Sequence, residues 1–142
     1  MKIALYSKIG RRHLKPFQDK YKDLKIKNLD TTIRKFRKNI ITSNNSDLNN
    51  LIRFSDFFNL SELRDLIFHV KEHQFTISQI QNILKELEFS FCGFTDTKNI
   101  YNTFDDFIRI NEDSYNLDIW KKIEEKYKNT FDTMYDFWIQ KN

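Results

Sequence analysis

The chain has 142 residues, of which 39% are hydrophobic and 31% are charged, a balance that excludes a disordered tail and fits one soluble globular domain. Two glycines and one proline favour helices over a strand-and-turn architecture, and 14 phenylalanines predict a core built from aromatic rings. One cysteine excludes an internal disulfide and fits a cytoplasmic location, and no apolar run reaches the roughly 18 residues of a membrane span.

The net charge of +4 is distributed unevenly along the chain. Residues 1–43 hold 13 Lys or Arg against 3 Asp, a net charge of +10, whereas residues 44–142 hold 11 against 17, a net charge of −6. A basic first third predicts contact with nucleic acid, with another acidic surface, or with the acidic remainder of the same chain. These charges belong to no recognised nucleic-acid-binding motif, so nucleic acid is the least favoured of these three partners.

The first predicted element is a short buried strand at Lys2–Ser7, which has a β-branched Ile and a Tyr in an apolar run. Such a strand needs a neighbour on each side to be buried. Pro16 should start or stop a helix in the basic stretch that follows, and Asp30 is a plausible N-cap for a helix through Ile41. A polar linker and a short helix within 47–58 come next.

The central predicted element is a helix over Asn59–Thr76, which Asn59 can cap with Glu62 in the reciprocal capping-box position. Its apolar stripe consists of Leu60, Leu63, Leu66, Ile67 and Val70. At roughly 100° per residue, acidic and imidazole side chains fall within one adjacent arc of about 100°. They are Glu62, Asp65, His69, Glu72 and His73. This arc fits a cleft wall or a solvated helix face.

The remaining elements alternate helices with strands. Thr76 and Gln79 predict a capping box for the next helix, and FSFCGF at Phe89–Phe94 predicts a strand in which Gly93 allows a bulge. Two further helices are predicted at Asn99–Ile110 and Leu117–Phe131. The alternating aromatic residues of Thr133–Lys141 predict a terminal strand.

One short motif suggests metal chemistry. His69 to His73 matches H-x-x-E-H, in which two His one helical turn apart hold zinc and the intervening Glu polarises a water. A third ligand would still be needed, and a five-residue match arises easily by chance in a charged helix. We therefore expect no metal site and keep zinc hydrolysis as a third hypothesis.

Four blocks in order carry a family resemblance: ALYSKIGRR, DFFNLSELRDLIFHVKEHQFT, FCGF and TFDTMYDFWIQK. Together they resemble the C-terminal part of a group of bacterial class I S-adenosylmethionine-dependent methyltransferases, some of which carry tetratricopeptide repeats. The resemblance implies a mostly helical α+β fold with a small mixed sheet of about three strands in the order 5-7-6. Within one partial domain, residues 1–8 would be strand 5, residues 9–88 an inserted helical cap, and residues 89–142 the remaining strands and helices.

The resemblance also implies that the cofactor half lies elsewhere. The glycine-rich loop and the acidic residue that hold S-adenosylmethionine in this family would precede Met1, so we expect these residues alone not to bind the cofactor and to be inactive. A second chain would supply that half, or the edge of the first strand would form a homodimer.

Site residues follow from the same placement. Tyr6 and Ser7 end a parallel-type strand, where open α/β sheets bind ligands. Arg11 and Arg64 would meet an anionic group of an unknown methyl acceptor, and the arc of the central helix would line the substrate cleft. His69 would act as the general base. The alternative is a non-enzymatic helical module whose basic first third binds an acidic protein or nucleic acid.

Overall fold

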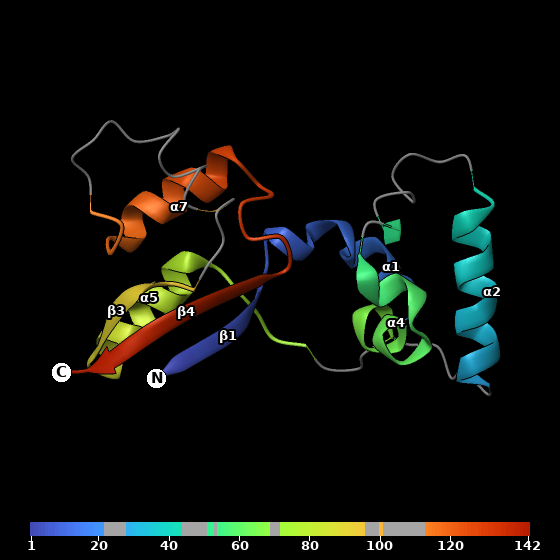
Figure 1. The fold of residues 1–142 in the computed structure, drawn as a ribbon, viewed down its shortest axis with the longest axis horizontal. Helices are drawn as coiled ribbons and strands as arrows, with labels where there is room; N and C mark the ends of the chain where they lie inside the picture. Colours follow the sequence, from blue (N-terminus) through green and yellow to red (C-terminus); the bar gives the residue numbers. More distant parts are fainter. Residues whose placement is uncertain (22–27, 44–50, 53, 69–71, 96–99, 101–112) are drawn as a thin grey trace. The chain divides into compact units, whose positions relative to one another are not determined.

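A computed structural model describes the chain except for residues 22–27, 44–50, 53, 69–71, 96–99 and 101–112 (Figure 1). The chain divides into two compact units, one made of residues 1–11 with 73–142 and the other of residues 12–72. The second unit is shorter than the predicted cap of residues 9–88, because the helix after Thr76 packs in the first unit.

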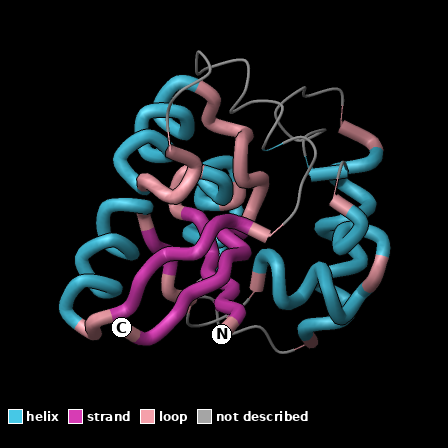
Figure 2. Tube along the Cα trace, turned by 60° about the vertical axis from the view of Figure 1, so that its left-hand side comes forward, coloured by secondary structure: helices cyan, strands magenta, loops and turns pink. Residues whose placement is uncertain are grey.

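The first unit contains a four-stranded mixed sheet, so the protein is α+β with four strands where about three were expected. The strands pair in the order β2-β1-β4-β3. Figure 2 shows them lying together in one sheet. The strands are β1 (Lys2–Ser7), β2 (Gln74–Phe75), β3 (Phe89–Phe94) and β4 (Met134–Lys141). β4 is antiparallel to both β1 and β3, and β2 is parallel to β1. The strand that the sequence did not predict is β2.

One face of this sheet is covered by helices α5 (Ile77–Glu86) and α7 (Leu117–Lys126). Alternate residues of β4 point into this core, and Tyr135, Phe137 and Ile139 are all buried. Aromatic rings fill it as expected: Phe94 lies 5.0 Å from Trp120 and 4.5 Å from Phe131 between ring centroids. The core thus holds α7 against β4.

Two local predictions in this unit are confirmed. Thr76 and Gln79 form the reciprocal capping box at the start of α5. The β3–β4 register shifts between Phe91 and Phe94, and Gly93 between them has a φ of 108°, a conformation that glycine tolerates best.

The second unit is helical and has its own core. Its elements are η1 (Gly10–His13), which begins in the first unit, α1 (Lys15–Tyr21), α2 (Leu29–Ile41), η2 (Ser55–Phe58) and α4 (Leu60–Ile67). Ile33, Phe36 and Ile40 form the buried stripe of α2. Asn28, not Asp30, caps this helix, because the Asn28 side chain accepts a hydrogen bond from the Thr31 N–H.

The predicted helix over Asn59–Thr76 is wrong at its C-terminal end, because the structure describes Phe68 and residues 72–76 outside any helix. Asn59 caps α4 as expected, but Phe68 ends the helix, and Gln74 already belongs to β2. Phe68 packs its ring 4.7 Å from Tyr21 and 5.8 Å from Phe36, so the aromatic cluster of the second unit holds the chain where the helix stops. The helix at 117 also ends early, at Lys126. Residues 99 and 101–110 of the predicted Asn99–Ile110 helix lie outside the described residues, as do residues 47–50 and 53 of the short helix predicted within 47–58.

Within the described residues, no helix combines the length and the hydropathy that a bilayer crossing requires.

Candidate functional site

The C-terminal end of β1 brings together two of the predicted site residues, Tyr6 and Arg11. β1 ends at Ser7, and the chain turns into η1, which carries Arg11. The Arg11 guanidinium carbon lies 4.1 Å from the centroid of the Tyr6 ring, a cation–π geometry. Arg11 is buried, whereas Tyr6 is 37% exposed. Tyr6 is therefore the accessible member of the pair.

Ser7 belongs to a buried hydrogen-bond network with Glu124 of α7 and Tyr135 of β4. The Ser7 hydroxyl accepts from the Gly10 N–H at 2.9 Å and donates to Glu124 Oε1 at 2.9 Å. The Tyr135 hydroxyl donates to the same carboxylate, at 2.7 Å from Oε1 and 2.9 Å from Oε2. All three side chains are at most 2% exposed. A buried carboxylate is tolerated because these two hydroxyl groups solvate it.

The protonation of Tyr135 follows from this setting. Burial raises the pKa of the Tyr135 phenol, and the negative charge of Glu124 raises this pKa further. The phenol therefore stays neutral in the folded protein well into the alkaline range and remains a hydrogen-bond donor to Glu124.

The backbone after β1 also lies very close to the backbone before β4. A Cβ atom built on Gly10 would lie 1.8 Å from the Asp132 carbonyl oxygen, so only glycine fits there. The Ser7 N–H also donates to the Thr133 carbonyl at 3.0 Å. The end of β1 is thus held against the turn that precedes β4. The hydrogen-bond network therefore positions the end of β1 against this turn, and the buried Ser7 hydroxyl does not face solvent.

The predicted acidic and imidazole arc is not one helix face. Glu62, Arg64 and Asp65 are exposed on α4, where Arg64 Nε lies 3.8 Å from Asp65 Oδ1. His69 lies outside the described residues. Glu72 follows the end of the helix, and its carboxylate lies 3.4 Å from the Gln18 side-chain amide.

The last residue of the arc, His73, is exposed and belongs to the first unit. The chain therefore divides between Glu72 and His73. Within the described residues, no group of three or more His, Cys, Asp or Glu side chains is arranged to hold a metal ion.

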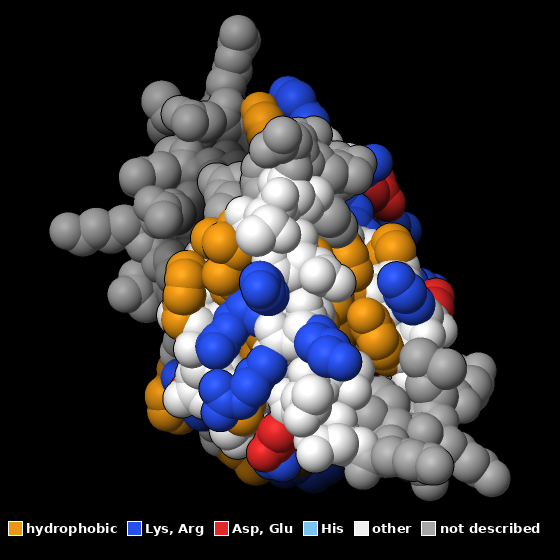
Figure 3. Space-filling model, turned by 90° about the vertical axis from the view of Figure 1, so that its right-hand side faces the viewer, with side chains coloured by type: hydrophobic (Ala, Val, Ile, Leu, Met, Phe, Trp, Pro, Cys, Tyr) orange, Lys and Arg blue, Asp and Glu red, His pale blue; other side chains and the backbone are white. Residues whose placement is uncertain are grey.

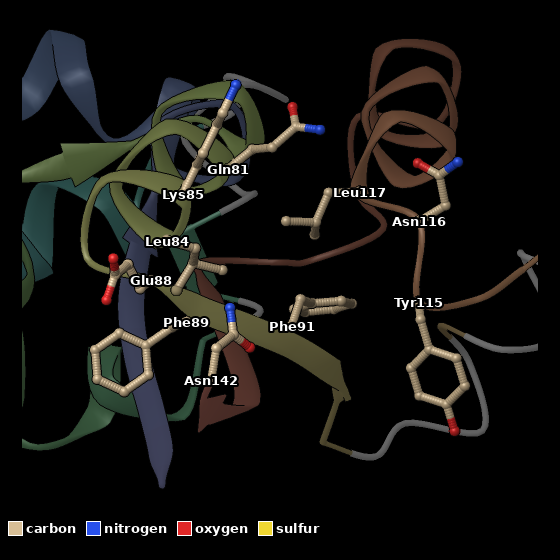
Figure 4. A pocket seen from close by; sticks show the side chains of 10 residues that line it. All are labelled: Gln81, Leu84, Lys85, Glu88, Phe89, Phe91, Tyr115, Asn116, Leu117 and Asn142. Carbon is tan, nitrogen blue, oxygen red and sulfur yellow. The ribbon is translucent and has the colours of Figure 1, made fainter.

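An open groove lies in the first unit, and its described lining includes none of the predicted site residues. It has a volume of about 420 Å³, within the range of small-ligand sites. Figure 4 shows Leu84 of α5, Phe91 of β3 and Leu117 of α7 forming its apolar floor. The other lining residues are Gln81, Lys85, Glu88, Phe89, Tyr115, Asn116 and Asn142. Sequence reasoning missed this groove because its residues come from three separate stretches of the chain.

Comparison with known proteins leaves the family open. No family model matches the chain, and a search of curated proteins finds no match.

Proposed function

We propose that these residues form the C-terminal, substrate-side part of a class I S-adenosylmethionine-dependent methyltransferase whose cofactor half comes from elsewhere. The observation that carries this proposal is the arrangement of the sheet. KIALYS, MYDFWIQK and FSFCGF lie side by side as β1-β4-β3, and β4 is antiparallel to both neighbours. The resemblance implies the same order, 5-7-6, with strand 7 antiparallel.

The outer edge of β1 supports the second half of the proposal. In the first unit, β2 pairs only with Tyr6 and Ser7, so no described strand is paired with Lys2–Leu5 on that edge. Hydrogen bonds join Met1 to Ile139 and Ser7 to Thr133, so the odd-numbered residues of β1 direct their backbone groups at β4. Lys2 and Ala4 therefore direct theirs outward. A strand of the cofactor half would pair there.

This alternation allows a selective substitution. Ala4→Pro removes an outward N–H and leaves the hydrogen bonds to β4 intact, and proline is tolerated at a sheet edge. We expect the Ala4→Pro chain to remain folded, with its circular dichroism spectrum unchanged. It should no longer pair with a strand along the outer edge of β1. Leu5→Pro is the contrasting variant, because it removes an N–H that points at β4, and it should destabilise the sheet.

The test is co-expression of tagged residues 1–142 with a class I cofactor half encoded in a neighbouring reading frame. We expect a one-to-one complex that binds S-adenosylmethionine, and we expect Ala4→Pro to abolish the complex. A complex that forms equally well with Ala4→Pro, or one that fails to bind the cofactor, would contradict the proposal. Sedimentation of the chain alone distinguishes pairing with a cofactor half from pairing with a second copy of this chain. A homodimer that Ala4→Pro dissociates would assign this edge to the second copy.

The catalytic role proposed for His69 belongs to the assembled enzyme. A neutral imidazole near the methyl acceptor would take the proton that the acceptor loses. In an active complex, His69→Gln should lower kcat and remove the acidic limb of the pH–rate profile while leaving cofactor affinity unchanged. Unchanged kcat would remove His69 from the mechanism.

A further inference from the structure

Helix α2 of the second unit exposes a basic surface. At about 100° per residue, its buried stripe of Ile33, Phe36 and Ile40 lies opposite an arc of about 100° that carries three cations. They are Arg34, Lys35 and Lys38, and all three are exposed. Figure 3 shows Lys and Arg side chains gathered on the face that α2 presents.

Acidic side chains are scarce around these three charges in the described part of the chain. Asp30 in the first turn is the only acidic residue in the sequence of α2. None of the described carboxylates lies within 4.0 Å of the Arg34, Lys35 or Lys38 cations. A surface of this kind attracts a polyanion, and its binding should weaken as salt is added.

An exposed phenylalanine, Phe58, is joined to α2 through its backbone. Arg37, on the flank of α2 next to Arg34, donates from Nη1 to the Phe58 carbonyl at 2.9 Å and thereby joins η2 to α2. Phe57 is buried and anchors η2, whereas Phe58 is 60% exposed. The two ring centroids lie 5.4 Å apart in an edge-to-face arrangement, and Phe58 keeps more than half of its surface exposed.

We propose that Arg34, Lys35, Lys38 and Phe58 form a binding surface for single-stranded nucleic acid. The cations, which lie within about 6 Å along the helix axis, would contact neighbouring phosphates, and a base would stack on the Phe58 ring. An acidic protein segment would satisfy the charges, but it has no base to place on an exposed ring. A duplex keeps its bases stacked and would bind only through phosphates. This surface lies in the second unit and goes beyond the proposed methyltransferase function.

The experiment measures fluorescence anisotropy of labelled single-stranded RNA and DNA of mixed sequence, about 20 nucleotides long, from 50 to about 200 mM salt. A duplex of the same sequence and labelled polyglutamate serve as comparison ligands. We expect the full chain to bind the single strands more tightly than both. Tighter binding of polyglutamate would overturn the proposal in favour of an acidic protein partner.

Two variants separate charge from stacking. Removing three phosphate contacts with Arg34→Gln/Lys35→Gln/Lys38→Gln should weaken binding about 100-fold at 0.1 M salt and reduce the slope of log K against log salt by about 2. Phe58→Leu keeps an apolar side chain and should weaken binding by about fivefold or more without changing that slope.

A matched variant controls for net charge. Lys8→Gln/Lys121→Gln/Lys122→Gln removes three exposed cations from the first unit. It should reduce affinity far less than the α2 variant does. Equal losses in the two triple variants would overturn the proposal, as would an unchanged affinity in Phe58→Leu. All the substituted side chains are exposed, and thermal unfolding checks that each variant remains folded.

Discussion

Removing the Tyr135 hydroxyl tests the buried network directly. Tyr135→Phe deletes the donor that lies 2.7 Å from Glu124 Oε1 and keeps the hydrogen bond that the Ser7 hydroxyl donates to the same carboxylate. A hydrogen bond to a buried charged group contributes about 1.5–3 kcal/mol, so we expect a loss of about 2 kcal/mol in the free energy of unfolding. For a chain of this size that corresponds to a Tm lower by roughly 6 °C.

The matched control removes the same atom from an exposed ring. Tyr115 is 61% exposed, so Tyr115→Phe should change the free energy of unfolding by less than about 0.5 kcal/mol. Urea unfolding of the three proteins at pH 8 provides the comparison. Equal stabilities of the Tyr135 and Tyr115 variants would refute the energetic importance of the network.

The raised pKa of Tyr135 gives the same variant a pH signature. Above pH 10 the phenol ionises in the unfolded chain and stays protonated in the folded one, so the folded state holds more protons and its stability falls as pH rises. Tyr135→Phe lacks this group. The stability gap between wild type and variant should therefore be constant below about pH 9 and shrink above pH 10, by at most about 1.4 kcal/mol per pH unit. A gap that stays constant through pH 11 would contradict the assigned pKa direction.

Two further substitutions test the local geometry of the first unit. Gly10→Ala should destabilise the chain by about 1–3 kcal/mol or more, because its Cβ would meet the Asp132 carbonyl; wild-type stability in urea unfolding would show that this close approach is wrong. Thr76→Ala removes the side chain that accepts from the Gln79 N–H and should cost about 1 kcal/mol, with faster amide exchange in the first turn of α5; unchanged exchange there would argue against the capping box.

The strands were predictable from sequence where alternation extended over enough residues. β4 alternates buried Tyr135, Phe137 and Ile139 with more exposed neighbours over eight residues, and this pattern belongs only to a strand. β2 has two residues, too few to show any period. Its formation depends on the end of β1 being available as a pairing partner, which sequence periodicity does not reveal.

The central helix was overextended because its apolar period continues past the point where the helix ends. Leu63, Leu66 and Ile67 keep helical spacing, and Val70 continues it in the sequence. The aromatic contacts of Phe68 with Tyr21 and Phe36 come from distant parts of the chain and outweigh that local preference.

The candidate site was predicted in part. Tyr6 and Ser7 were chosen because they end a strand, and Arg11 as a contact for an anionic group, whereas Glu124 and Tyr135 were missed. Ser7 and Glu124 are 117 residues apart, and only the packing of α7 on the sheet brings them together. A signal was present: Glu124 follows Leu117 and Trp120 at helical spacing and thus lies on the buried stripe of α7. An acidic residue on such a stripe needs a polar partner.

Calorimetric titration of folded residues 1–142 with S-adenosylmethionine and with its demethylated product tests the central claim most directly. If these residues form a substrate-side part without the cofactor site, no saturable heat should appear at ligand concentrations up to roughly 1 mM, and binding should appear only once the cofactor half is added. One-to-one binding with a micromolar Kd by this chain alone would show that it builds a cofactor site itself, and would contradict the account.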